Sequence, residues 1–202
     1  MVSVRSMLGV ALLCLPVHAV AQESLAPDTL PFHRGQWAAQ FAGGSSFASL
    51  GVLRFAGPTR AWLLDFRFSG GHSHDTSRIN DTLVVQGFTS NAAATARIGR
   101  RFYQARGKSV ASFQTVGALG GYTHQCSGGF GGGSCTNGWN AGAFVDLGGT
   151  YLVTPRFGIG GTATLSFSYQ RDTAKGTGGA VDKRWAYQAG FQGLSFAATI
   201  YF

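Results

Sequence analysis

The strongest constraint in this sequence is an alternation of apolar with polar or small side chains. The segment 61–69 shows it most clearly, because its even-numbered residues are all apolar and two charged residues, Asp65 and Arg67, lie between them. The apolar set is Trp62, Leu64, Phe66 and Phe68. Successive side chains of a β-strand point to opposite faces, so the segment is predicted to form a strand with one apolar and one charged face.

The same alternation recurs along the sequence and predicts an all-β chain. We expect strands at 36–43, 49–56, 61–69, 94–103, 110–122, 139–153, 157–169 and 185–202. Within the last strand the apolar residues change from odd to even numbers, and a shift of one residue turns a strand over. We therefore expect either a β-bulge at Gly193 or an outer part of the strand in a different environment.

Composition narrows the class of protein. Charged residues make up 12% of the sequence, about half the share of roughly 25% in soluble globular proteins. Beyond residue 21 no segment approaches the roughly 20 consecutive apolar residues of a transmembrane helix. The net charge is +8, but the basic residues are scattered among apolar faces. This scatter favours a solvated surface or contact with anionic lipopolysaccharide over nucleic-acid binding.

The end of the sequence carries a motif of its own. From 194 to 202 the even-numbered residues are apolar: Leu194, Phe196, Ala198, Ile200 and Phe202. This ending resembles the C-terminal assembly signal of bacterial outer-membrane β-barrels, an alternating apolar strand that ends in Phe. The sequence is similar in build to small barrels of this superfamily, such as the OmpA transmembrane domain, OmpX and OmpW. The resemblance implies an eight-stranded antiparallel up-and-down transmembrane β-barrel in the bacterial outer membrane.

The resemblance also implies a set of partners. These are the barrel-assembly machinery and periplasmic chaperones, with residues 194–202 as the signal, together with outer-membrane lipid and lipopolysaccharide. A monomer without a cofactor and without a nucleic-acid partner is expected.

The N-terminal residues predict export. Residues 1–21 combine Arg5, an apolar run and a small-residue cleavage site ending at Ala21, as in a secretory signal peptide. Residues 22–34 lack alternation and contain two prolines, so we interpret them as a periplasmic lead-in. The barrel itself is expected to span 35–202.

A strand-like run at 83–91 complicates the strand count. Bacterial single-chain barrels have even strand numbers, and a ninth strand would leave the two ends of the barrel on opposite sides of the membrane. We therefore assign 70–91 to a long external excursion, such as a hairpin arm beyond the bilayer.

An eight-stranded barrel has an interior filled by side chains rather than a wide channel. Charged side chains that point inward should therefore be paired, because an unpaired charge in a confined site is costly. The predicted lumen network consists of Arg54, Asp65, Arg67, Arg97, Arg101 and Asp146. The same residues would form the gate if the barrel conducted.

Aromatic residues near the strand ends are expected to face outward and form interfacial girdles. The candidates are Trp37, Tyr103, Tyr122, Trp139, Tyr151, Tyr169 and Tyr201. Arg100 breaks the alternation of 94–103 and is expected to reach back to the interface.

Two cysteines lie beyond the signal peptide, Cys126 and Cys135, and a glycine-rich segment joins them. In an oxidising periplasm they are predicted to form a disulfide that pins an external loop, with a stabilisation of about 2 to 3 kcal/mol. A metal site is a weaker alternative, because His124 is the single histidine beside them.

Candidates for catalysis are sparse. His72 and His74 could hold a metal, or Ser73 could act as a nucleophile, but no third, orienting group accompanies them. Outer-membrane lipid A deacylases use a His, Ser and Glu set, and Glu23, the one Glu beyond the signal peptide, lies in the lead-in. No catalytic residue and no metal ligand is therefore predicted.

We expect a non-enzymatic surface protein whose loops serve envelope integrity, adhesion or host contact. The alternative is a narrow porin-like conduit for small or hydrophobic molecules. A lipid A-modifying enzyme is less favoured, as is a secreted lipocalin-like ligand-binding barrel. The lipocalin interpretation rests on Gly35-Gln36-Trp37, and the low charge and Phe202 argue against it.

Overall fold

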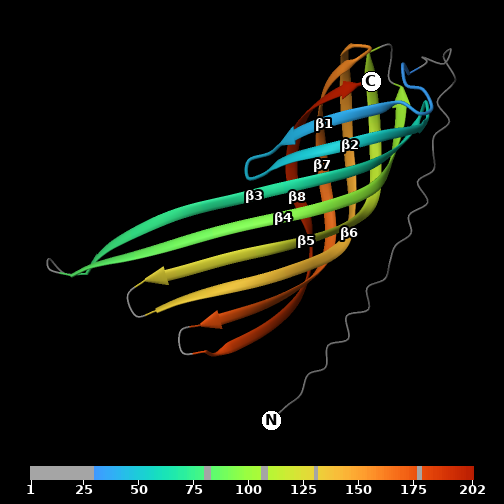
Figure 1. Ribbon diagram of the computed structural model, residues 1–202. Helices are drawn as coiled ribbons and strands as arrows, with labels where there is room; N and C mark the ends of the chain where they lie inside the picture. The colour runs from blue at the N-terminus through green and yellow to red at the C-terminus, as the bar shows by residue number, and fades with distance from the viewer. Residues whose placement is uncertain (1–29, 80–82, 106–108, 130–131, 177–178) are drawn as a thin grey trace, which may run out of the picture.

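The computed structural model describes residues 30–79, 83–105, 109–129, 132–176 and 179–202. The predicted signal peptide and most of the lead-in lie outside the described residues. Within the described part of the chain, eight β-strands follow one another around a closed ring (Figure 1). They are β1 (Trp37–Gly43), β2 (Ala48–Gly57), β3 (Arg60–Ile79), β4 (Leu83–Ala105), β5 (Val110–Gly129), β6 (Gly132–Thr154), β7 (Phe157–Gly176) and β8 (Val181–Tyr201).

Each strand pairs antiparallel with the next, and β8 pairs with β1 to close the ring. The prediction of an eight-stranded up-and-down β-barrel is therefore confirmed. Turns at the end where the chain's C-terminus lies are short, as at 58–59 and 155–156. Outer-membrane barrels have short periplasmic turns and longer extracellular loops, so we call this the periplasmic end.

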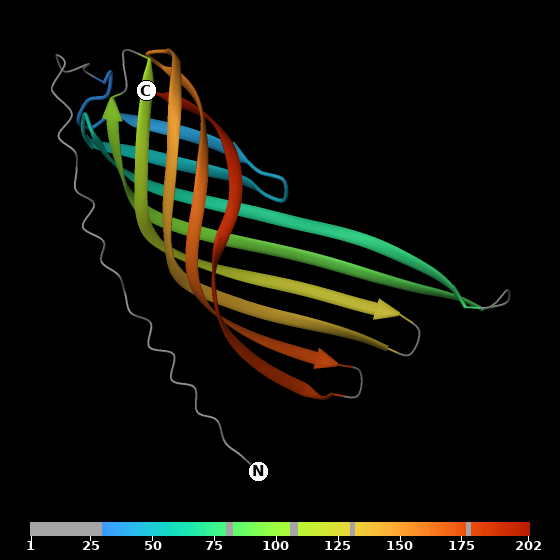
Figure 2. The same ribbon diagram turned by 180° about the vertical axis from the view of Figure 1, so that it is seen from behind.

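The strands differ greatly in length. β1 and β2 have 7 and 10 residues, whereas β3 to β8 have 20 to 23. The β2–β3 pairing ends at Ala48 and Phe68, and the β1–β8 pairing ends at Gly43 and Phe196. Beyond these points β3 to β8 continue as an open, curved sheet (Figures 1 and 2). We call its described residues within 69–93, 123–138 and 172–184 the extracellular sheet.

The excursion predicted at 70–91 is a hairpin arm. β3 and β4 run into it without a break, and their register continues from Gly70 opposite Ala92 to Ile79 opposite Leu83. Residues 83–91 are thus the outer part of β4 and add no ninth strand. The alternation predicted shorter strands, because it fades where both faces of a sheet meet water while the backbone pairing continues.

A β-bulge in β8 resolves the change of parity. Ala163 of β7 pairs with Leu194 and Leu165 pairs with Phe191, so β8 carries an extra residue between the two pairs. Gly193 has a φ of +92°, a conformation that glycine adopts at little cost. The bulge keeps Phe191 and Leu194 on the same outward, exposed face, which confirms the first of the two alternatives.

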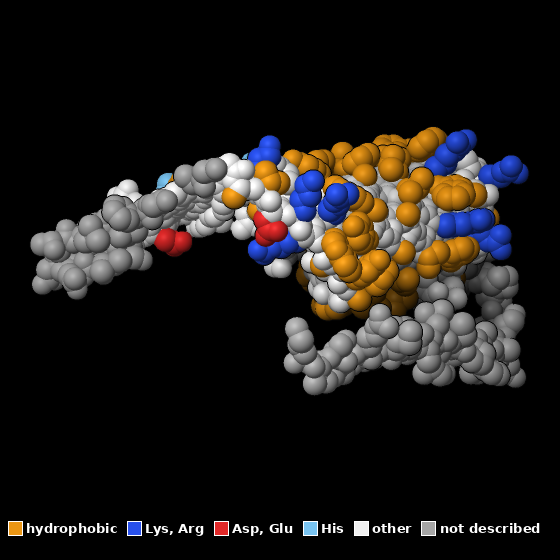
Figure 3. All heavy atoms as spheres, turned by 90° about the horizontal axis from the view of Figure 1, so that it is seen from below, with side chains coloured by type: hydrophobic (Ala, Val, Ile, Leu, Met, Phe, Trp, Pro, Cys, Tyr) orange, Lys and Arg blue, Asp and Glu red, His pale blue; other side chains and the backbone are white. Residues whose placement is uncertain are grey.

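The barrel is apolar outside and polar inside. Its outer surface exposes large apolar side chains on every strand, among them Phe41, Val52, Leu64, Ile98, Val116, Val145, Leu165 and Ile200. On the face that Figure 3 shows, hydrophobic side chains cover much of the barrel as a broad band. Inward side chains include buried Asp65, Arg97 and Asp146. Such a surface is stable in a lipid bilayer and is unfavourable in water. In the described residues, no helix is both long and apolar enough to cross a membrane.

Candidate functional site

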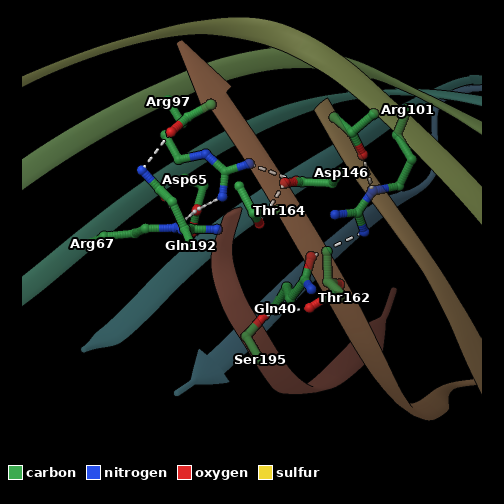
Figure 4. Close-up of polar contacts among 12 residues, drawn as sticks. Gln40, Asp65, Arg67, Arg97, Arg101, Asp146, Thr162, Thr164, Gln192 and Ser195 are labelled. Atoms are coloured by element: carbon green, nitrogen blue, oxygen red, sulfur yellow. Dashed lines mark hydrogen bonds and ion pairs between the residues drawn. The ribbon is translucent and has the colours of Figure 1, made fainter. Parts of the chain in front are cut away.

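An ion-pair network fills the middle of the lumen (Figure 4). Arg97 of β4 pairs with Asp146 of β6 at 2.5 Å, Nη2 to Oδ2, and with Asp65 of β3 at 3.3 Å, Nη1 to Oδ2. Arg67 donates from Nε to the same Asp65 oxygen at 3.2 Å. Thr164 of β7 donates to the second oxygen of Asp146 at 2.8 Å. The network therefore ties together strands that are not neighbours in the ring.

A second polar layer lies closer to the periplasmic end. Arg101 donates from Nη1 to Gln40 Oε1 and from Nε to Thr115 Oγ1, both at 3.0 Å. Its guanidinium carbon lies 4.1 Å from the centre of the Phe113 ring. Each buried arginine is therefore held by polar groups and by an aromatic face.

Glycines make room for the aromatic ring beside Arg97. The guanidinium carbon lies 3.7 Å from the centre of the Phe144 ring. A Cβ atom at Gly117 would lie 2.8 Å from this ring, and one at Gly99 would lie 3.1 Å from it. Side chains at these two positions would displace Phe144 and with it the arginine.

Little free space remains in this part of the lumen. The gap among Gln40, Asp65, Arg97, Arg101 and Asp146 measures about 20 Å³, which holds about one water molecule. The space among these described side chains is therefore too small for a solute larger than water.

Aromatic rings close the periplasmic end. Phe32, from the lead-in, is buried, and its ring centre lies 4.6 Å from that of Phe55 and 5.0 Å from those of Tyr103 and Tyr201. Tyr103 and Tyr201 were predicted to face outward in a girdle, and this prediction is wrong. They point inward because they share strand parity with the lumen residues Arg101 and Thr199.

The prediction that Arg54 faces the lumen is also wrong. Leu53 and Phe55 are buried inside the barrel, so Arg54 between them points outward, with its guanidinium carbon 5.3 Å from the centre of the Trp37 ring. The interior of the periplasmic end is apolar, and polarity therefore does not mark the inward face of β2. The other five predicted lumen residues, Asp65, Arg67, Arg97, Arg101 and Asp146, all belong to the two polar layers.

The remaining predicted aromatic residues face outward. Trp37, Tyr122, Trp139 and Tyr151 are about half exposed. The ring of Tyr169 lies 5.5 Å from those of Trp139 and Tyr187, so aromatic contacts continue from β6 across β7 to β8. Arg100 lies outside the lumen, with its guanidinium carbon 5.6 Å from the centre of the Trp62 ring. In the C-terminal segment, Leu194, Phe196, Ile200 and Phe202 are exposed and Ala198 is half-buried on the same outer face.

The predicted disulfide is present on the β5–β6 hairpin. Cys126 and Cys135 are direct partners in the register and are covalently joined. The donor atoms of His124 and the two cysteines lie within 4.8 Å of one another, but sulfurs joined in a disulfide are not thiolate ligands. The structure therefore gives a covalent bridge at this place rather than a metal site.

The residues considered for catalysis do not assemble a catalytic set. His72 and His74 lie on one face of β3, where their Nε2 atoms are 2.8 Å apart and share a hydrogen bond. Ser73 lies between them in the strand and so points to the opposite face. The nucleophile considered for this segment is thus separated from both imidazoles.

Together, the closed ring, the apolar exterior and the ion-paired interior define the class of protein to which this fold belongs. The chain has the fold of a small transmembrane β-barrel of the outer-membrane type. No protein-family model and no curated protein matches the sequence.

Comparison with solved structures supports this fold at one point. The chain is similar to a major outer membrane protein from Thermus thermophilus, with a TM-score of 0.58 and 9% identity over 83% of this chain and 98% of that chain. More distant are Acinetobacter baumannii CarO2 (TM-score 0.43, 9% identity, 83% and 98% covered) and Ail, the attachment invasion locus protein of Yersinia pestis (0.42, 12%, 84% and 99%). At 9% identity, the similarity to the Thermus thermophilus protein supports the fold and says nothing of the function.

Proposed function

We propose that this chain is a non-enzymatic protein of the bacterial outer membrane that acts through its extracellular sheet, in adhesion, host contact or envelope integrity. The observation that carries the proposal is a contrast within one molecule. The lumen is filled by ion pairs, whereas six of the described strands continue past the ring as an exposed sheet. A barrel that served as a conduit would need the opposite arrangement.

The outer face of β7 and β8 supports a contact with the lipid surface. Arg171 is the register partner of both Trp139 and Trp185, just above the apolar band. Lys175 and Lys183 follow on the same face, further from the membrane. Aromatic rings favour the membrane interface, and cations beside them attract anionic head groups. We propose lipopolysaccharide phosphates as the groups that this face contacts.

Assembly partners follow from the C-terminal segment. Its apolar side chains face outward along β8, where an insertion factor could bind them before they meet lipid. We propose that the barrel-assembly machinery and periplasmic chaperones recognise residues 194–202, and that the folded protein is a monomer.

The test of the proposed function is a variant with a shortened arm. Residues 70–91 are replaced by a short turn that joins Ser69 to Ala92, which leaves the ring and its lumen network unchanged. We expect cells that carry this variant to lose surface attachment or resistance to detergent while the barrel still reaches the outer membrane. Attachment and resistance equal to those of the parent protein would contradict an active role for the sheet.

A further inference from the structure

Two hydrogen bonds to Asn137 orient an imidazole beside one sulfur of the disulfide. Tyr122 donates its hydroxyl to Asn137 Oδ1 at 2.8 Å, and His124 Nδ1 lies 2.6 Å from the same oxygen. Because a carbonyl oxygen only accepts, Nδ1 carries the hydrogen in this bond. The other imidazole nitrogen, Nε2, then lies 3.3 Å from Cys126 Sγ. Asn137 therefore fixes the tautomer and directs Nε2 at the sulfur.

The second sulfur has a different basic neighbour. Lys175 of β7 is the register partner of Cys135, and both side chains lie on the outward face of the extracellular sheet. On the β4 side, the residues opposite His124 and Cys126 are Ala92 and Ser90. Among the described register neighbours of the disulfide on this face, the ionisable side chains are His124, Tyr122 and Lys175.

The hairpin that carries the disulfide is also paired on both sides of it. The pairs on either side of it, Gln125 with Thr136 and Ser127 with Ser134, already hold the hairpin together. The two cysteines are 9 residues apart, and closing this loop contributes about 2 to 3 kcal/mol, less than a longer loop would give. Both cysteines are partly exposed and lie beyond the apolar band, within reach of dissolved reagents.

We propose that the Cys126–Cys135 disulfide is a site of exchange with small thiols of the glutathione class, and that His124 is its proton donor and acceptor. The thiolate attacks Cys135 Sγ and forms a mixed disulfide there. The Cys126–Cys135 bond breaks, and its electron pair goes to Cys126 Sγ. Protonated His124 then donates its Nε2 proton to this sulfur, which leaves as a thiol.

The second half of the cycle follows from the same groups. A second small thiolate attacks the sulfur of the glutathione moiety, which releases Cys135 as a thiolate and the small disulfide as product. A cation stabilises a thiolate, so Lys175 favours this release. In the reverse direction, neutral His124 accepts the proton of the Cys126 thiol, and the resulting thiolate attacks Cys135 Sγ of the mixed disulfide. The bond from Cys135 Sγ to the glutathione sulfur breaks, glutathione leaves as a thiolate, and the bridge is resealed.

The test follows reduction of the detergent-folded full chain by glutathione, with free thiols trapped and counted by mass. The rate is divided by that of glutathione with a small reference disulfide at each pH, which removes the ionisation of glutathione itself. Imidazoles change protonation between about pH 5 and 8, so the normalised rate of the parent protein is expected to fall as the pH rises through this range. His124→Gln should be slower by at least about 10-fold at the acid end and should lose this pH dependence.

Two controls keep the test specific. His72→Gln removes an imidazole from the same face but away from the disulfide, and it should leave the rate unchanged. Asn137→Ala should lower the reduction rate by less than His124→Gln does. It removes the hydrogen bond that orients the imidazole but leaves the imidazole in place. Equal rates for His124→Gln and the parent at all pH values would overturn the proposal. A glutathione adduct trapped on Cys126 rather than Cys135 would overturn the assignment of the attacked sulfur.

Discussion

Arg97 and Asp146 form an ion pair inside the barrel, with 2.5 Å between Nη2 and Oδ2 and both side chains almost fully buried. Their strands, β4 and β6, are separated in the ring by β5. The pair therefore acts across the lumen rather than along a ladder. It occupies the interior and links two strands that are not direct neighbours in the ring.

Removing the charge of Asp146 should destabilise the barrel. Asp146→Asn leaves the Arg97 guanidinium short of a buried counter-charge, and breaking such a pair costs about 3 kcal/mol. Urea unfolding of the detergent-folded protein, followed by tryptophan fluorescence, measures this change in the free energy of unfolding.

The exposed ion pair of β8 provides the matched control. Asp182 accepts from Arg184 at 2.8 Å, but both side chains are more than half exposed. Asp182→Asn should therefore change the free energy of unfolding by less than about 1 kcal/mol. Similar losses for both variants would argue against a structural role for the lumen network.

Phe32 should anchor the lead-in to the barrel. Phe32→Ala removes a ring that contacts Phe55, Tyr103 and Tyr201, and the loss of a buried ring costs about 3 kcal/mol. We expect faster protease cleavage near residue 30 and a lower unfolding midpoint. The control is His33→Ala, at the exposed neighbouring residue, which should behave like the parent protein. If Phe32→Ala also behaves like the parent, the Phe32 ring does not anchor the lead-in.

The disulfide should protect both cysteines from alkylation. Without a reductant, the native protein is expected to take up no alkylating reagent at Cys126 or Cys135. After reduction, mass spectrometry should find two labels. Labelling of either cysteine before reduction would mean that the bridge is incomplete in the isolated protein.

Deletion of Phe202 should reduce assembly. The proposed signal ends at this exposed ring, and its loss should lower the amount of protein in the outer membrane without changing synthesis. Replacing Phe191, an outward apolar residue of the same strand outside residues 194–202, by Leu serves as the control. Normal outer-membrane levels after the deletion would contradict the assembly role of the segment.

Most of the ring could be predicted from alternation because lipid and lumen impose opposite polarities on the two faces of each strand. The rule held for Asp65, Arg97 and Asp146, which lie where the outer wall meets lipid and the inner wall is polar. Alternation also indicated the extra residue at Gly193. The apolar residues of the last strand change there from odd to even numbers, and such a change has few structural explanations.

The same rule failed where the environment changes. At the periplasmic end both faces of β2 are apolar, so polarity alone places Arg54 on the wrong side. Residue type suggests an outward position for Tyr103 and Tyr201, although their parity with Arg101 and Thr199 indicates an inward one. In the extracellular sheet both faces meet water, so no alternation marks how far the strands extend.

Side-chain contacts between strands could not be predicted from the sequence, because they depend on the register of the strand pairs. The two cysteines and His124 were visible as neighbours, but Asn137 lies on the next strand and its role follows from the pairing of His124 with Asn137. The same holds for the pairing of Arg97 with two acids from different strands. Alternation predicts the face of the strand on which a side chain lies, but it does not predict which residue of another strand that side chain contacts.

The most direct test of this account is the current carried by the folded protein in a planar lipid bilayer. Gel migration that changes on boiling first establishes that the inserted protein is folded. A sealed lumen predicts no discrete conductance steps from the parent protein at any applied voltage. Stepwise currents that change when Arg97 or Asp65 is neutralised would contradict a closed barrel and support the conduit instead.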